Sequence, residues 1–278
     1  MKPYLVALCA FACCWSACEE AIEGCVQPRA VNFDPEADVN ANCIYYQLEL
    51  QWQHYSATQP NDTLLPQRFL TDAAGDSFFI ESCRILGSKV YLTKVGDSDP
   101  TTSPESLLLS TTDNGNQNIP DNFFGIRIDQ YAAAAGGWIE RGDFDRLTLQ
   151  LGLDTTLRGN TPQQFIEGGR PPLPISSTLE AHPFEVGADP FLYDSINAIY
   201  PTLHLTVVQP DTTVITVQID DVVPFSFPYV VTAKDGENVP IRLRLDYDQL
   251  LQGIRWNSDS STIANQLSQK LPLSLSTY

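Results

Sequence analysis

The sequence predicts an all-β protein, an antiparallel two-sheet β-sandwich with a short C-terminal helix. The first observation is a period of two, because apolar and polar residues alternate in segments such as 48–53, as on a strand with one buried face. The second is that many such short segments are separated by Gly, Pro and Asn, a pattern typical of antiparallel sandwiches and barrels. The third is the four-residue spacing of Ile263, Leu267 and Leu271, which predicts a helix.

The predicted strands follow one another from residue 45 onward. They are 48–53, 78–92, 147–151, 203–207, 215–219, 225–233 and 241–245. Ser261 or Thr262 is expected to cap the C-terminal helix, and Pro272 is expected to end it. Two long connections, 96–122 and 158–189, are expected to be loops, and loops of this length tend to be functional or mobile.

The N-terminus resembles a secretory signal. Lys2 precedes an apolar stretch over 3–15, which is too short to cross a bilayer because a spanning helix needs about 20 apolar residues. The length matches the apolar region of a signal peptide. Residues 1–17 are therefore expected to be a signal peptide, followed by a stalk over 18–44 and a β-sandwich domain over 45–278.

Small residues stand directly before Cys18, as in the lipobox of bacterial lipoproteins, whose cysteine is acylated. A tryptophan occupies the usual leucine position, so Cys13 and Cys14 remain alternative sites, as does an ordinary signal without lipidation. Two glutamates follow Cys18 and resemble the signal that sends some Gram-negative lipoproteins to the cell surface. The resemblance implies an outer-membrane lipoprotein, at the cell surface or in the periplasm, that contacts the membrane through its lipid.

Composition excludes one class of partner. The chain of 278 residues has a formal net charge of −18, and such a surface repels phosphate backbones, whose binding depends on Lys and Arg. Nucleic acid is therefore not expected as a partner. With 43% hydrophobic residues, the chain has enough apolar material to form a core.

The predicted stalk is bounded by Cys25 and Cys43, which are expected to form a disulfide in an oxidising compartment. Closing this loop would stabilise the segment by about 3 kcal/mol on the chain-entropy account of disulfides. The segment resembles a short cysteine-bounded motif common in secreted bacterial proteins. We favour a spacer, and the alternative is a calcium site with oxygen ligands from Asp34, Glu36, Asp38 and Asn40. Cys83 lies in an apolar strand pattern and is expected to be a buried, inert thiol.

Several stretches occur in an order that resembles one known family. They are LQWQH at 50–54, GDSF at 75–78, SKVYL at 88–92, LQLGLD at 149–154, IRLRLDY at 241–247 and LLQGI at 250–254. This order is similar to that of the MbnP-like family, secreted proteins related to a copper-associated periplasmic protein. Lys89 stands where the family pattern has asparagine. The resemblance implies a β-sandwich and names copper as the cofactor to consider.

The region 191–200 departs from the family pattern, because both tryptophans expected there are missing. In the copper-binding relatives an oxidised tryptophan contributes to the metal site, and a di-haem partner enzyme helps to form it. Copper would then depend on imidazole ligands, for which the chain offers only His54, His182 and His204. These are far apart in sequence, and His54 and His204 are assigned to the polar phase of their strands.

Signatures of common enzymes are missing from the sequence. It contains no G-x-S-x-G elbow, H-E-x-x-H zinc helix, phosphate-binding glycine loop or C-x-x-C motif. The first hypothesis is therefore a non-enzymatic binding module that presents its long loops to a protein or glycan. A copper-binding protein using the three histidines is the alternative, and a hydrolase with paired carboxylates is the third.

Overall fold

The computed structural model describes residues 21–26, 28, 32–41, 47–59, 61, 63–64, 68–100, 106–111, 115–120, 122–139, 141–158, 200–234 and 238–278. The chain divides into two units, Met1–Ile44 and Tyr45–Tyr278. The signal peptide and the lipidation site Cys18 lie outside the described residues and stay predictions. No helix in the described part of the chain is long and apolar enough to span a membrane.

Two short parallel strands, β1 (Glu23–Gly24) and β2 (Val39–Asn40), form the described part of the first unit. Three of the four side chains considered for calcium accept hydrogen bonds from backbone N–H groups of this unit. They are Asp34, Asp38 and Asn40, with donor–acceptor distances of 2.9, 3.3 and 3.1 Å. These oxygens therefore hold the chain's turns, which favours the spacer.

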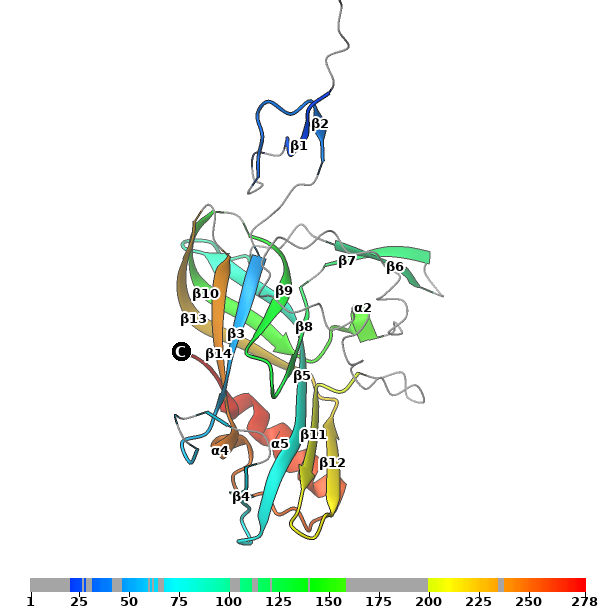
Figure 1. Ribbon diagram of the computed structural model, residues 1–278, viewed down its shortest axis with the longest axis vertical. Coiled ribbons are helices and arrows are strands. Elements are labelled where there is room, and N and C mark those ends of the chain that lie inside the picture. Colours follow the sequence, from blue (N-terminus) through cyan, green and yellow to red (C-terminus); the bar gives the residue numbers. More distant parts are fainter. Residues whose placement is uncertain are drawn as a thin grey trace, which may run out of the picture. The chain divides into compact units, whose positions relative to one another are not determined.

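The larger sheet of the second unit has seven strands. They are β4 (Leu70–Thr71), β5 (Ser77–Lys94), β8 (Phe124–Arg127), β10 (Gly142–Leu151), β11 (Leu203–Val208), β12 (Val214–Ile219) and β13 (Val223–Ala233). The hydrogen-bonded order is β12–β11–β5–β10–β13, with β4 and β8 also paired to β5 (Figure 1). All of these pairs are antiparallel.

The smaller sheet has the order β15–β14–β3–β9. Its strands are β3 (Gln47–Tyr55), β9 (Ala132–Trp138), β14 (Val239–Asp246) and β15 (Leu275–Thr277). The predicted all-β sandwich is confirmed, and the parallel pair of β3 with β14 is an exception to the antiparallel arrangement. The connection 96–122 was expected to be a loop, but it contains a hairpin of β6 (Ser106–Thr111) and β7 (Gly115–Pro120).

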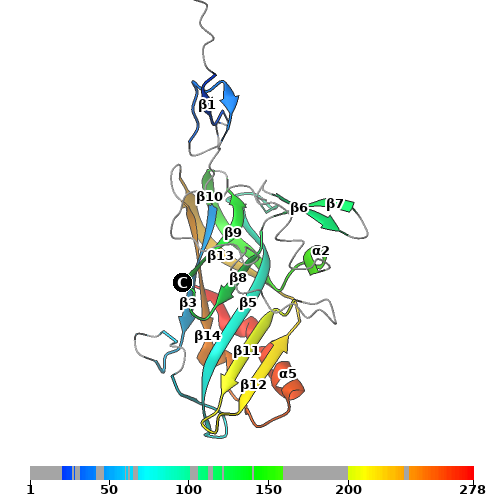
Figure 2. The same ribbon diagram turned by 45° about the vertical axis from the view of Figure 1, so that its right-hand side comes forward.

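A single apolar core joins the two sheets and the C-terminal helix. The helices are α2 (Thr155–Arg158), α4 (Tyr247–Leu250) and α5 (Ser260–Ser274). As predicted, α5 buries Ile263, Leu267 and Leu271. It packs against α4 and against β12 (Figure 2). The expected cap was wrong. Asp259 caps the helix by accepting from the Thr262 N–H at 2.9 Å, because a carboxylate at this earlier position reaches that amide. Helix α5 also continues through Pro272 instead of ending there.

β5 is the longest strand and changes partners midway. Arg84 faces β11 on one edge and β8 on the other, whereas Gly87 faces β10 and β8. Therefore β11 and β10 follow one another along one edge of β5, and β8 lies along the opposite edge. The change occurs at Leu86, whose N–H donates to the Thr202 carbonyl at 3.0 Å and whose carbonyl accepts from the Gly152 N–H at 2.8 Å.

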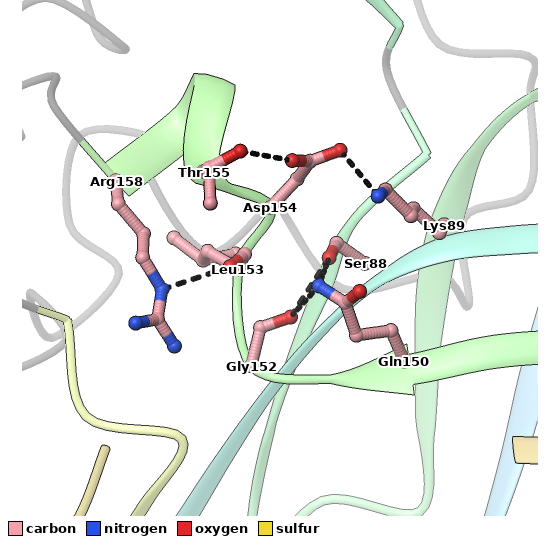
Figure 3. A network of polar contacts seen from close by, with 8 residues as sticks. All are labelled: Ser88, Lys89, Gln150, Gly152, Leu153, Asp154, Thr155 and Arg158. Atoms are coloured by element: carbon pink, nitrogen blue, oxygen red, sulfur yellow. Dashed lines mark hydrogen bonds and ion pairs between the residues drawn. The ribbon is translucent and has the colours of Figure 1, made fainter. Parts of the chain in front are cut away.

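Polar contacts secure this junction (Figure 3). Ser88 Oγ donates to the Gly152 carbonyl at 2.7 Å, and Lys89 Nζ lies 2.9 Å from an Asp154 carboxylate oxygen. Lys89 has a φ of 55°, in the left-handed region, where asparagine is better tolerated than most residues. This conformation accommodates the shift in register between β5 and β10. Two of the stretches that carry the family resemblance therefore meet in a structural junction.

The hydroxyl of Tyr229 links the two sheets at an edge. It donates to the Pro240 carbonyl at 2.8 Å and accepts from the Arg242 N–H at 2.9 Å, just before β15 takes over pairing with β14. Burial raises the pKa of the Tyr229 phenol, so the phenol stays protonated at neutral pH.

Tyr229→Phe is expected to lower the free energy of unfolding by about 1–2 kcal/mol in urea denaturation. Tyr91→Phe is the control, because its hydroxyl has no hydrogen bond within the described part. Equal losses in both variants would contradict the role of Tyr229.

Candidate functional site

The outer face of the smaller sheet carries polar side chains from two neighbouring strands. In β3 the apolar residues at even positions are buried, so the odd positions point away from the core. In the parallel register of β14, Arg242 stands opposite Gln51 and Arg244 opposite Gln53. We call the following set the polar row: Glu49, Gln51, Gln53, Arg242 and Arg244.

Hydrogen bonds hold the polar row in a fixed arrangement. Arg244 Nε donates to Gln53 Oε1 at 2.7 Å, and Arg242 Nε donates to Gln51 Oε1 at 3.2 Å. Gln51 Nε2 donates in turn to Glu49 Oε1 at 3.3 Å. These bonds use only part of each side chain's capacity, since a guanidinium has five donors and a carboxylate about four acceptor positions. The row can therefore offer oriented donors and acceptors to a ligand.

Aromatic side chains accompany the polar row. Tyr131 and Tyr278 are 53% and 49% exposed, and exposed rings gathered on one face indicate a binding surface. The Arg244 guanidinium lies 4.7 Å from the centre of the Tyr55 ring and 5.4 Å from that of Tyr278. Cation–π contacts with Arg244 therefore orient the rings of Tyr55 and Tyr278.

A groove of about 410 Å³ runs along this face, and sites for small ligands usually have volumes of about 300–1,000 Å³. Its walls combine aromatic, amide, hydroxyl and carboxylate groups from Glu49, Gln51, Trp52, Gln53, Thr63, Tyr131, Ala132 and Tyr278. Such a wall suits a ligand with an apolar face and several hydroxyl groups, because rings receive the apolar face while amides and carboxylates pair with hydroxyls.

His54, the first predicted metal ligand, lies in the core. Its Nε2 donates to the carbonyls of Arg127 and Gln130 at 2.9 and 3.0 Å, and its Nδ1 accepts from the Tyr247 hydroxyl at 2.9 Å. Both ring nitrogens are therefore in use. Burial lowers the pKa of His54 to about 4, against a smaller opposing effect of the two carbonyls, so the ring is neutral at pH 7.

The assignment of His54 to the polar phase of its strand was wrong. His54 lies on the buried face of β3 with Leu48, Leu50 and Trp52, because side chains two residues apart in a strand point to the same face. Its polar ring is accommodated there only because carbonyl and hydroxyl partners surround it.

The other two histidines do not add a described metal site. His204 on β11 is 8% exposed, stands opposite Arg84 in β5, and has an Nδ1 without a hydrogen bond among the described residues. Burial and the Arg84 charge lower the pKa of His204. His182 lies outside the described residues. The described part contains no group of three or more His, Cys, Asp or Glu that could hold a metal ion, and copper binding stays a prediction.

Cys83 is buried and free, as expected from its apolar surroundings. Burial raises the pKa of its thiol to about 12, with a smaller opposing effect of a hydrogen bond to Tyr247. The thiol is therefore inert at neutral pH. Cys25 is also buried, but Cys43 lies outside the described residues, so their disulfide stays a prediction.

The hydrolase hypothesis requires two carboxylates that face one cleft. Asp72 and Asp248 line the same cavity beside β4 and α4, but each carboxylate already binds the chain. Asp72 accepts from the backbone N–H groups of Ala74, Asp76 and Trp256, and Asp248 from Ser56 Oγ, the Ala57 N–H and Thr58 Oγ1. These contacts give both carboxylates a structural role.

Sequence patterns indicated the strands of the polar row but not the site. The alternation in β3 and β14 places these residues on the outer face, yet it does not show that the two strands are neighbours. Tyr131 stands in a turn and Tyr278 at the C-terminus, where no periodicity applies. The pairing of β3 with β9 and β14, and of β14 with β15, brings the two tyrosines beside the polar row.

Comparison with known proteins gives a distant likeness. No family model matches the sequence, and no curated protein matches it. Among solved structures, the chain is similar to MbnP from Methylosinus trichosporium, with 12% sequence identity and a TM-score of 0.32. The match covers 77% of this chain and 81% of that one. A likeness at this distance transfers no residue role.

Proposed function

We propose that the chain is a non-enzymatic binding module whose outer β-sheet face takes a neutral glycan. The observation that carries this proposal is the combination of two exposed tyrosines, Tyr131 and Tyr278, with the Glu49, Gln51 and Gln53 side chains of the polar row in one groove. A sugar ring has apolar C–H faces that pack on aromatic rings and hydroxyl groups that both donate and accept hydrogen bonds. The groove offers partners for both.

The charge of the chain supports a neutral ligand. A net charge of −18 disfavours polyanionic partners at long range, and a neutral glycan is indifferent to it. In this proposal the lipid at Cys18 would attach the module to the outer membrane, and residues 18–44 would form its stalk. The site differs from the long loops expected to meet a partner, because it lies on the sheet.

Binding of the full-length chain to an array of neutral gluco-, manno-, xylo- and galacto-oligosaccharides tests the proposal. At least one of these sugars should be retained, and Tyr131→Ala or Tyr278→Ala should weaken its binding about tenfold, which corresponds to about 1.4 kcal/mol. Phe33→Ala is a matched control, since Phe33 is an exposed ring (42%) in the other unit. Retention of no neutral sugar, or wild-type affinity in both tyrosine variants, would overturn the proposal.

A further inference from the structure

A second cavity of about 460 Å³ lies beside β4 and α4, away from the residues of the groove. Its apolar wall includes the buried side chains of Phe78 and Leu251. Phe69 stands at the same cavity with 60% of its surface exposed and packs edge-on against Phe79, with ring centres 5.7 Å apart. The volume and the mixed wall match those of small-molecule sites.

Charge in this cavity has one sign. Asp72 and Asp248 line it, and none of the described residues that line it is Lys, Arg or His. Three hydrogen bonds bind each carboxylate to the chain. A carboxylate has about four acceptor positions, so each retains capacity for a further donor. Two negative charges without a lining cation attract a positively charged ligand.

Gln59 adds an unpaired polar group to the same wall. The residue is 9% exposed, and its Oε1 is buried without a hydrogen bond among the described residues. A buried acceptor without a donor is uncommon in folded proteins. Because Gln59 lines the cavity, the N–H group of a bound ligand would supply the donor that this oxygen lacks.

We infer that this cavity binds a small organic amine in its ammonium form. The apolar body of the amine would lie against Phe78 and Leu251, and its ammonium group would donate to Gln59 near Asp72 and Asp248. The exposed ring of Phe69 can add a cation–π contact. This site is independent of the proposed glycan groove, because the two share no lining residue.

Calorimetric titration of the full-length chain with three probes of similar shape tests the inference. The probes are phenethylamine, 2-phenylethanol and 3-phenylpropanoate. Phenethylamine should bind with a Kd below about 1 mM, and the alcohol and the carboxylate should bind at least about tenfold more weakly. Equal binding of the alcohol, tighter binding of the carboxylate, or no binding of the amine would each overturn the inference.

Variants at Gln59 separate its role from general packing. Gln59→Leu should weaken phenethylamine binding about tenfold without lowering the Tm of the unliganded chain, because it removes an unpaired polar atom. Gln59→Glu should strengthen binding. Gln209→Leu, in the β11–β12 connection, is the control and should bind like the wild type. Unchanged affinity in Gln59→Leu contradicts the inference, whereas normal amine binding by Tyr131→Ala and Tyr278→Ala shows that the two sites are separate.

Discussion

Acidification from pH 7 to pH 4 is expected to remove about 3 kcal/mol of the unfolding free energy through His54. The pKa of His54 is about 4 in the folded chain, whereas the ordinary value of 6.5 applies to the unfolded chain, and each unit of difference corresponds to about 1.4 kcal/mol. The neutral ring contributes its stability fully above pH 6.5. This contribution falls as pH drops toward 4, because the unfolded chain binds the proton first. Below pH 4 both states carry the proton, and the loss ends.

Urea denaturation of the wild type and of His54→Gln at both pH values isolates this contribution. The variant should lose stability at pH 7, because the Tyr247 hydroxyl and two carbonyls lose their ring partner. Its further loss on acidification should be smaller than that of the wild type by about 3 kcal/mol. Carboxylates contribute equally to both chains and cancel. The same pH dependence in both proteins would show that the ring does not titrate in this way.

Gly152→Ala is expected to lower the free energy of unfolding by about 3 kcal/mol. Gly152 has a φ of 90°, a conformation that costs an L-residue about 1–2 kcal/mol. A Cβ would also lie 2.5 Å from Thr202 Oγ1 and 3.3 Å from Val222 Cγ2, and overpacking of a buried site adds about 1–3 kcal/mol. Both effects fall at the junction where β5 changes partners, and Thr202 is fully buried there.

Gly75→Ala separates the two causes. Gly75 has a φ of 89°, but nothing lies within 4 Å of its Cβ position, so this variant should show the backbone cost alone. Urea denaturation should place Gly152→Ala at least about 1 kcal/mol below Gly75→Ala. Adding Thr202→Ala to Gly152→Ala should recover part of the difference. Equal stability of the two single variants would mean that the contact with Thr202 is unimportant.

The alternation of apolar residues was sufficient to predict the strands that bury one face. β3 and β14 follow this pattern. His54 was assigned to the polar side of its strand, although it stands two residues after Trp52 and four after Leu50, a spacing that matches the buried side. β9 was missed because Ala132–Trp138 consists mainly of alanine and glycine, which have little strand preference. Its pairing with β3 therefore depends on tertiary structure. The hairpin β6–β7 was missed for a similar reason, since its segment combines few apolar residues with many turn-forming ones.

The sequence shows which types of residue the candidate sites contain, but it does not show which of these residues lie next to one another. Gln51 and Arg242 are opposite one another because β3 and β14 pair in parallel, and local sequence does not determine which strands pair. Gln59 gave no signal at all, because a glutamine in a polar segment is ordinarily exposed. Lys89 was the more informative position. Its φ of 55° lies in the left-handed region, where asparagine is better tolerated than lysine.

The long strand β5 affects the order in which the chain can fold during synthesis. Its first half pairs with β11, and ~110 residues separate the end of β5 from Leu203. At ~5–20 residues per second, a ribosome needs ~5–20 seconds to make them. During that interval the first half of β5 lacks β11 along one edge and presents open backbone groups to other chains. The nascent protein is therefore most prone to mispairing before β11 emerges, and this is the stage at which a chaperone would protect it.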